Sequence, residues 1–328
     1  MEERLIVTAS PHIRDRATTR GLMGDVLIAL LPCVAAATVI FGLHALAVIG
    51  VTAAASAAFE YIYCKLMKKP VPVGDLSACV TGVILGLNMP AGMPLWICVV
   101  GAFVAIVITK QLFGGLGYNF ANPALVGRIV LFLGFAERMT TYVFPEGTAD
   151  AVSSATVLAD SVDKASVSLW DMLIGVRGGV MGETCVIAIL IGLAYLLIRG
   201  VINLSIPASI VGTVFVLSLI ADGGNVHVAL VEIMSGGLLF GAVFMATDYV
   251  TSPFNTKGRI IYGIVIGLIT FAIRRFGSMN EGVSYALLMG NLLTPWFNEW
   301  SHQIPLGFVK KNKAKKAAPA DGGKGGAQ

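Results

Sequence analysis

A polar segment, residues 137–171, separates two apolar halves of this 328-residue chain and contains the run Asp150-Ala-Val-Ser-Ser-Ala-Thr156. Three hydroxyl groups lie close together in this run, on Ser153, Ser154 and Thr156. Such hydroxyls can cap the first turn of a helix, where a serine accepts from a backbone N–H and Asp150 favours the helix start. They can also accept a covalently attached group, because an accessible loop of small residues admits another molecule. The pattern by itself fits both roles.

The segments that must position this run are strongly apolar. Hydrophobic residues make up 56% of the chain and charged residues only 13%, whereas a soluble domain has about 25% charged residues. The composition predicts an all-α polytopic membrane protein with about ten transmembrane helices. The apolar runs are residues 26–41, 45–64, 76–87, 96–108, 123–135, 185–198, 206–220, 228–246, 260–273 and 283–296. Several are short and rich in Gly or Asn, which indicates broken helices around an internal site.

The polar segment divides the runs five and five. A repeat with an odd number of spans ends on the other side of the membrane, so a second copy would be inserted in the opposite orientation. We therefore expect two inverted five-helix repeats. Residues 113–127 and 276–290 share a weak sequence similarity that fits a duplication. The expected divisions are a cytoplasmic N-terminus (1–22), a first transmembrane half (23–136), an external loop (137–171), a second transmembrane half (172–302) and a disordered cytoplasmic tail (303–328).

Basic residues predict the orientation, since they collect on the cytoplasmic side of a membrane. With both termini cytoplasmic, nearly all basic clusters fall on that side, and residues 137–171, with six acidic and two basic residues, fall outside. The markers are Arg4, Arg14, Arg16, Arg20, Lys65, Lys68, Lys69, Lys110, Arg199, Lys257, Arg259 and the lysines from 310 to 316. Arg274 and Arg275 are exceptions near the outer face.

The remaining composition excludes several kinds of site. The five cysteines are scattered singly without CxxC spacing, which argues against a disulfide framework, a zinc site or an iron–sulfur cluster. We therefore expect no metal site. The basic tail is suited to anionic lipid or another protein of a complex, and a nucleic-acid partner is not expected.

The spacing Asp-x-x-Ser-x-Ala-Thr resembles the flavinylation signature of the NqrB/RnfD family. That family comprises the RnfD component of the Rnf ion-translocating ferredoxin:NAD oxidoreductase and the NqrB component of the sodium-pumping NADH:quinone oxidoreductase. The resemblance implies that a flavin transferase joins FMN through its phosphate to the hydroxyl of Thr156. Asp150, Ser153, Ser154 and Ala155 then complete the motif. Ser154 stands where the family usually has Gly.

Residues 114–128 and 244–259 resemble other stretches of the family, so the resemblance extends from about residue 14 to about residue 300. It implies a membrane flavoprotein of a prokaryotic cell membrane that passes electrons between ferredoxin and NAD, coupled to Na⁺ or H⁺ movement. It also implies a non-covalent riboflavin and, as partners, the other Rnf subunits (A, B, C, E and G). The protein would not be active alone, and no residue is assigned a catalytic role. The Rnf branch is preferred over the quinone-reductase branch, because the first span begins near the start of the sequence.

Five further polar residues are candidates for function. Asn119 and Arg128 lie at the edge of a short apolar run, where polar groups cost free energy unless they are paired, and are candidates for cofactor binding. A snorkelling role is the alternative for Arg128. Asp248, Glu60 and Glu281 are candidates for an ion path. We expect Asp248 to cap a turn and the two glutamates to be solvated near the water interface.

Two other functions fit the pattern of spans. A solute carrier or channel would have the same span count and repeats, and a cofactor-free scaffold protein would use the acidic loop for docking. Neither gives Thr156 a role, so the mass of the peptide that contains Thr156 distinguishes them from a flavoprotein.

Overall fold

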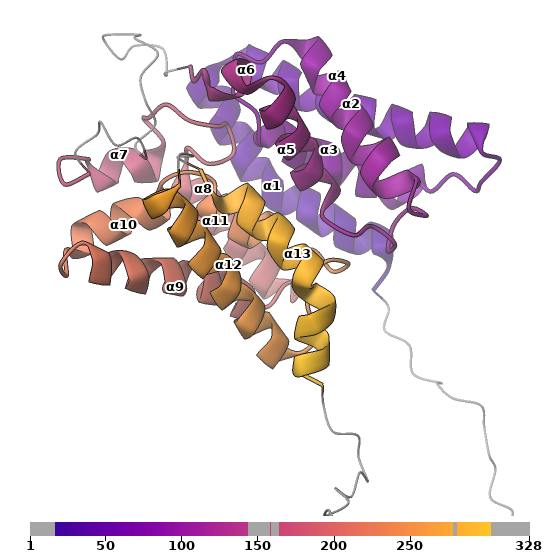
Figure 1. Ribbon diagram of the computed structural model, residues 1–328. Coiled ribbons are helices and arrows are strands. Elements are labelled where there is room, and N and C mark those ends of the chain that lie inside the picture. The colour runs from indigo at the N-terminus through magenta and orange to yellow at the C-terminus, as the bar shows by residue number, and fades with distance from the viewer. Residues whose placement is uncertain (1–16, 144–157, 159–163, 278–280, 303–328) are drawn as a thin grey trace, which may run out of the picture.

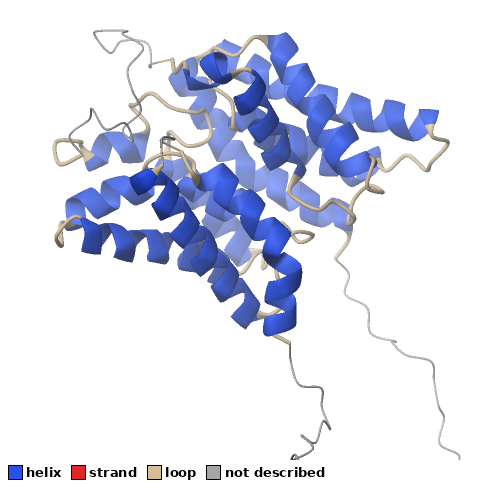
Figure 2. Cartoon of the chain, viewed as in Figure 1, coloured by secondary structure: helices blue, strands red, loops and turns tan. Residues whose placement is uncertain are grey.

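Each of the ten apolar runs is helical over most of its length in the computed structural model, which describes residues 17–143, 158, 164–277 and 281–302. No strand occurs within these ranges (Figure 2). The α-helices are α1 (Thr19–Phe41), α2 (Leu43–Leu66), α3 (Ser77–Leu87), α4 (Leu95–Phe103), α5 (Pro123–Gly134), α6 (Ala136–Thr140), α7 (Leu169–Ile174), α8 (Val186–Ile198), α9 (Ser205–Ala221), α10 (Val226–Met234), α11 (Leu238–Phe240), α12 (Thr256–Phe276) and α13 (Val283–Trp300). The 3₁₀ turn η1 (Val73–Asp75) and the π-helices η2 (Val104–Gln111) and η3 (Gly241–Met245) complete the described elements. The expected all-α polytopic class is confirmed.

The helices differ in whether they can cross a bilayer unaided. In the described part of the chain, three helices, α1, α2 and α12, are long and apolar enough to do so. A fourth candidate joins α10 to the segment Leu238–Met245 through a bend of 63°. The apolar helices α3, α4 with η2, α5, α8 and α9 have 10–17 residues, so they need neighbouring helices to cover their ends. The short and broken spans therefore match the sequence prediction.

Helix ends follow from local chemistry. Gly42, with φ +80°, is the single residue between α1 and α2, and it takes a left-handed conformation that residues with a Cβ avoid. Asn122 begins α5, because its Oδ1 accepts from the N–H groups of Ala124 and Leu125 at 3.0 and 3.4 Å, and Pro123 follows at the first helical position. Asn122 therefore has a structural role at the start of α5.

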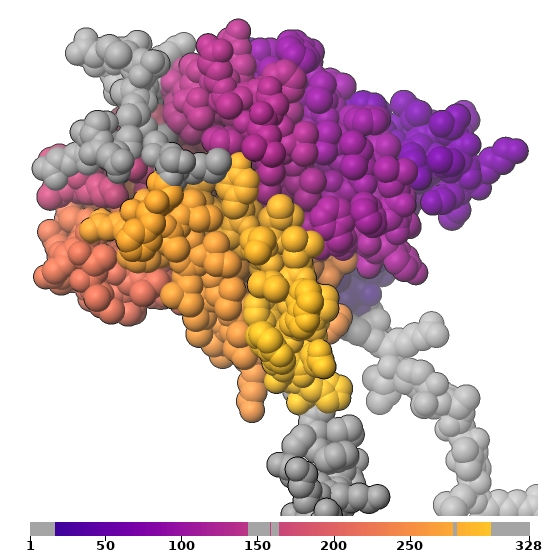
Figure 3. All heavy atoms as spheres, in the orientation of Figure 1, coloured from indigo at the N-terminus to yellow at the C-terminus, as the bar shows by residue number. Residues whose placement is uncertain are grey.

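Corresponding helices of the two halves have corresponding neighbours. In the first half α2 packs on α3 and α4, and α4 packs on α5; in the second half α9 packs on α10 and α12, and α12 packs on α13. The halves meet where α1 packs on α8 and α5 packs on α13, which are counterparts in this scheme. Figure 3 shows the boundary between them as a continuous contact between the magenta and yellow surfaces. This packing supports the prediction of two repeats.

Both described ends of the chain lie on one side of the molecule. The start of α1 and the end of α13 are near the bottom of Figure 1, whereas α6 and α7 are at the opposite side. The polar segment 137–171 thus includes most of α6 and the start of α7. The motif residues Asp150, Ser153, Ser154, Ala155 and Thr156 and the predicted tail 303–328 lie outside the described residues.

Candidate functional site

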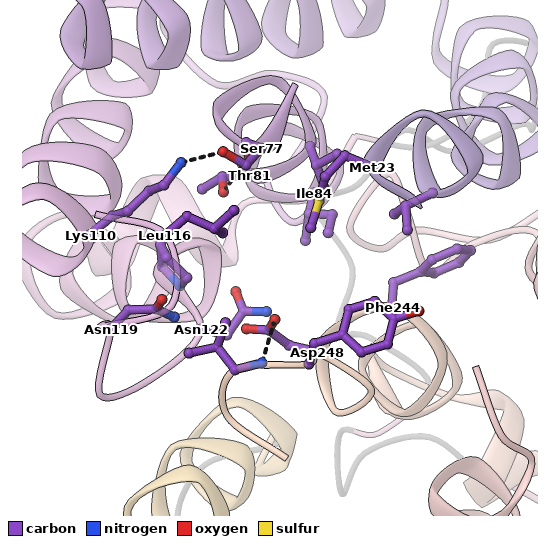
Figure 4. A pocket seen from close by; sticks show the side chains of 15 residues that line it. Met23, Ser77, Thr81, Ile84, Lys110, Leu116, Asn119, Asn122, Phe244 and Asp248 are labelled. Carbon is purple, nitrogen blue, oxygen red and sulfur yellow. Dashed lines mark hydrogen bonds between the residues drawn. The ribbon is translucent and has the colours of Figure 1, made fainter. Parts of the chain in front are cut away.

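A pocket lies between the two halves, and Figure 4 shows ten of its lining residues labelled. The first half contributes the polar residues Ser77, Thr81, Lys110, Asn119 and Asn122, and the second half contributes Phe244, Asp248, Tyr249 and Val250. Apolar side chains of α1 and α3, including Met23 and Ile84, complete the wall. The arrangement offers hydrogen-bonding groups beside an aromatic ring and aliphatic side chains, which suits a flat ligand with a polar edge.

Two π-helices place residues at this pocket. Lys110 belongs to η2, and Phe244 belongs to η3, which ends just before Asp248. A π-helix adds a residue to a turn and is frequent at functional sites. Its wider spacing shows in the bonds from the N–H of Leu112 to the carbonyl of Val107 and from Ala246 to Gly241.

Lys110 is buried and charged, and its partners explain how it is held. Its Nζ lies 2.7 Å from Oε1 of Glu60 and 2.6 Å from Oγ of Ser77. Gln111 donates to the same Glu60 oxygen at 2.8 Å, and both charged side chains are at most 2% exposed. Breaking such a pair from one side leaves a buried charge, which costs about 3–5 kcal/mol.

This placement corrects two expectations. Glu60 is not solvated near the interface but completely buried, where Lys110 and Gln111 both donate to its Oε1. Lys110 is not a surface marker of the cytoplasmic side, since Glu60 and Ser77 hold it inside the protein. The expectations treated each residue by itself. They missed the pair because Glu60 and Lys110 lie in different helices.

Asp248 caps a turn, as expected. Its carboxylate accepts from the N–H of Val250 at 3.4 Å and from the hydroxyl of Thr251 at 3.2 Å. The same side chain lines the pocket together with Asn119 and Asn122 (Figure 4). The structural role therefore leaves Asp248 available to a ligand.

A second polar site, which we term the arginine–glutamate cluster, consists of Asn88, Arg128, Glu183, Glu281 and Arg177. Arg128 Nη1 donates to Asn88 Oδ1 at 2.7 Å, and its Nη2 donates to Glu281 Oε2. Arg128 is only 5% exposed, so it is paired inside the protein and does not snorkel to the interface. The expected solvation of Glu281 is also wrong, since its carboxylate is bound to Arg128.

The break between α10 and α11 supplies a second donor to this cluster. The N–H of Gly237 donates to Glu281 Oε1 at 3.1 Å. A Cβ at Gly237 would lie 2.7 Å from that oxygen and 3.3 Å from Arg128 Nη1. Only a residue without a side chain leaves room for both charged groups here.

Arg128 and Asn119 line different cavities. Asn119 lines the pocket, whereas Arg128 belongs to the cluster and contributes to a separate small cavity with Glu281 and Tyr285. Asn119 precedes α5 and Arg128 lies within it, so the rise along the helix axis places the two side chains at different depths in the protein.

The sequence did not lead us to predict Arg177 and Glu183 as functional residues. Both lie in the loop before α8, where Gly182 donates to the carbonyl of Leu87 at 2.7 Å. Arg177 donates to the backbone carbonyl of Glu183. A sequence signal was present, because an arginine and a glutamate stand in a glycine-rich stretch directly before an apolar run.

Arg274 and Arg275, the two basic residues that do not fit the predicted cytoplasmic side, have acidic partners. Arg274 Nη1 donates to the carbonyl of Glu232 at 2.7 Å and also faces its carboxylate at 3.6 Å. Arg275 pairs with Asp222 at 3.3 Å. Both arginines are neutralised at their side of the protein, so they need not be on the side of the other basic residues.

Metal ligands do not gather in the described part of the chain, where no group of three or more His, Cys, Asp or Glu residues could hold an ion. All five cysteines, Cys33, Cys64, Cys79, Cys98 and Cys185, are unpaired with one another. Several carboxylates in this part of the chain are instead bound by lysine or arginine side chains, as Glu60 is by Lys110 and Glu281 is by Arg128.

The fold and these two internal polar sites define a polytopic α-helical membrane protein. Residues 6–307 match the model of the NQR2, RnfD, RnfE family, and the chain belongs to that family.

Curated relatives match nearly the full chain. The chain is 42% identical to the D component of the Na⁺-translocating ferredoxin:NAD⁺ oxidoreductase complex of Acetobacterium woodii, over 96% of this chain and 99% of the relative. It is 35% identical to the D component of the proton-translocating ferredoxin:NAD⁺ oxidoreductase complex of Clostridium ljungdahlii, over 92% and 96%. It is also 35% identical to the D component of an ion-translocating oxidoreductase complex of Stutzerimonas stutzeri, over 85% and 90%.

Proposed function

We propose that this protein is a membrane subunit of an ion-translocating oxidoreductase complex that passes electrons between ferredoxin and NAD through an FMN attached to Thr156. The run Asp150-Ala-Val-Ser-Ser-Ala-Thr156 in a chain of this family carries the proposal. The names of the relatives from Acetobacterium and Clostridium support the reaction. We infer that the protein acts with the other Rnf subunits (A, B, C, E and G) and is not active alone.

The chemistry of Thr156 suits an anchor. Its hydroxyl can form a phosphoester with the FMN phosphate, and small neighbours such as Ser154 and Ala155 suit an acceptor that a flavin transferase must reach. A flavin supplies one- and two-electron transfer chemistry when it is bound. The protein's own part is to hold it at one place beside the membrane helices.

The pocket between the halves is our candidate for the non-covalent riboflavin. The side-chain amides of Asn119 and Asn122 can donate to and accept from a polar ring edge. Phe244, Met23 and Ile84 provide apolar contacts for the ring faces. The kinds of side chain match the edge and the faces of a flavin, with Lys110 and Asp248 as the charged groups of the wall, and the cavity of about 80 Å³ would have to widen to admit the ring.

The membrane and the orientation follow from the same proposal. We place the protein in a prokaryotic cell membrane with both termini in the cytoplasm, as the distribution of basic residues indicates. The coupling ion is Na⁺ or H⁺, and relatives named for each ion are similar to this chain. Asp248, Glu60 and Glu281 stay our candidates for an ion path, the two glutamates as members of ion pairs with Lys110 and Arg128.

The test is to produce the full chain together with a competent flavin transferase. We expect yellow fluorescence that stays with the denatured protein band, and a peptide containing Thr156 whose mass increases by that of the FMN group. Thr156→Ala abolishes both signals, whereas Ser154→Ala, a change at a neighbouring hydroxyl, retains them. An unmodified Thr156 peptide in the presence of active transferase would contradict the proposal.

A further inference from the structure

Glu183 carries a carboxylate oxygen without a partner in the interior of the protein. The residue is 7% exposed, and its Oε1 accepts from the N–H of Val180 at 3.1 Å. Its Oε2 has no hydrogen-bond partner among the described residues. A buried ionised oxygen that nothing solvates costs several kcal/mol, so it has a strong tendency to take up a proton.

Gly237 shows where this unpartnered oxygen points. A Cβ at Gly237 would lie 3.5 Å from Glu183 Oε2 and 2.7 Å from Glu281 Oε1. Two carboxylates therefore approach the same glycine, at the break between α10 and α11. Glu281 is bonded to both Arg128 and the Gly237 N–H, whereas Glu183 Oε2 is not bonded to either.

The surrounding charges favour a proton over a metal ion. Arg128 already places a guanidinium beside the two carboxylates, and its Nη1 would be 3.3 Å from the Gly237 Cβ position. A metal ion needs several oxygen ligands free of such a cation. A proton needs only one oxygen, and Glu183 Oε2 provides it.

We propose that Glu183 is a proton-binding site at the boundary between the two halves of the protein. Its ionised carboxylate takes a proton from water and becomes a neutral carboxylic acid, so the cluster gains one positive charge. The neutral acid can donate a hydrogen bond from the oxygen that otherwise lacks a partner. Binding and release thus change the charge beside the ion pair that joins the two halves.

The groups that face Glu183 come from every element packed around it. They are Arg128 of α5, Tyr142 after α6, Arg177 of its own loop, Arg274 of α12 and Glu281 before α13. Burial raises the pKa of Glu183 to about 7, and the negative charge of Glu281 adds to the effect, while Arg128 and Arg177 oppose it. The site would therefore titrate near neutral pH.

This inference goes beyond the proposed function and does not depend on the FMN. A proton site at Glu183 requires only the fold and the charges described above. Loss of flavin attachment in the Thr156→Ala variant would leave it unchanged, so failure of one proposal is distinguishable from failure of the other.

The experiment is an infrared difference titration of the full chain in lipid nanodiscs, from about pH 5 to about pH 9. We expect the carbonyl stretch of a protonated carboxylic acid at low pH, lost with a midpoint of about 7. Glu183→Gln removes this band. Glu299→Gln, a change at an exposed glutamate of α13, leaves it at wild-type amplitude.

Two further measurements keep the test decisive if Glu183→Gln does not fold. Glutamate with a heavy carbon isotope in its side-chain carboxyl shifts the wild-type band, and Glu183→Asp shifts its midpoint. The absence of any titrating glutamate band in the wild type would overturn the proposal, as would a band of full amplitude in folded Glu183→Gln. A midpoint that moves when sodium replaces choline would assign a metal cation to Glu183 and overturn it too.

Discussion

Arg128 of α5 and Glu281 before α13 form an ion pair that joins the two halves of the protein, with Asn88, the residue after α3, as the second partner of the arginine. The pair is largely shielded from water, since the arginine is 5% and the glutamate 14% exposed. Charged groups that leave water must be compensated inside the protein. The boundary between the halves is thus held by a polar contact as well as by helix packing.

Replacing Arg128 with Met should destabilise the protein by up to about 3 kcal/mol, because the largely shielded Glu281 then keeps only the Gly237 N–H as a partner and Asn88 Oδ1 loses its donor. The measurement is thermal unfolding of the purified chain in detergent. Arg275→Met is the matched control, since Arg275 is 47% exposed in its pair with Asp222, and such pairs contribute less than about 1 kcal/mol. Equal small losses in both variants would show that Arg128 and Glu281 are not a buried pair.

Lys110→Met should also destabilise the protein by about 3–5 kcal/mol, because Glu60 would keep its charge without the ammonium. Adding Glu60→Gln removes that charge, so the double variant should recover part of the loss. Chemical denaturation of the single and double variants measures the coupling. Strictly additive losses would mean that the two side chains do not interact.

Stability should fall as pH rises through the titration of Glu183. Its folded pKa of about 7 exceeds the ordinary value of 4.5, so its contribution is complete below about pH 4.5 and is lost as pH rises through about 7. The wild type should lose about 3 kcal/mol relative to Glu183→Gln over this range. Unfolding temperatures of both proteins at several pH values provide the measurement, and parallel pH profiles would contradict it.

Gly82→Ala should separate α3 from α2. A Cβ at Gly82 would lie 2.5 Å from the Cα of Ala53, and backbone atoms cannot yield as a flexible side chain can. We expect a loss of about 1–3 kcal/mol. Gly24→Ala in α1 meets no atom within 4 Å and should be neutral or stabilising by up to about 1 kcal/mol. Thermal unfolding compares the two, and a similar effect of both would argue against close packing of α2 and α3.

Asp248→Asn separates the capping role of Asp248 from its charge. An asparagine Oδ1 still accepts from the Val250 N–H and the Thr251 hydroxyl, so stability should change by less than about 0.5 kcal/mol. Ion transport by the assembled complex in vesicles should fall several-fold if the charge serves an ion path. Wild-type transport at wild-type stability would leave turn capping as its role.

The ten apolar runs predicted the helices well, because a single segment that crosses lipid can satisfy its backbone N–H and C=O groups only within a helix. The sites were harder to predict. The pairing of Glu60 with Lys110 and of Arg128 with Glu281 joins residues 50 and 153 positions apart, and spacing along one helix carries no information about such partners.

The turn-capping role of Asp248, in contrast, could be predicted from the sequence. A local turn involving Val250 and Thr251 depends only on neighbouring residues, and the sequence was sufficient to predict it. The motif around Thr156 was recognised from its pattern, and its placement is outside the described residues.

The π-helix η2 makes the position of Lys110 depend on the winding of its helix. A π-turn contains one residue more than an α-turn, so each residue of η2 advances by a smaller angle around the axis than in an α-helix. If η2 became α-helical without a change of length, the residues after it would rotate around the axis, and the ammonium group of Lys110 would turn away from Glu60 and the pocket. The interior position of this cation therefore rests on the local widening of the helix as well as on the identity of the lysine.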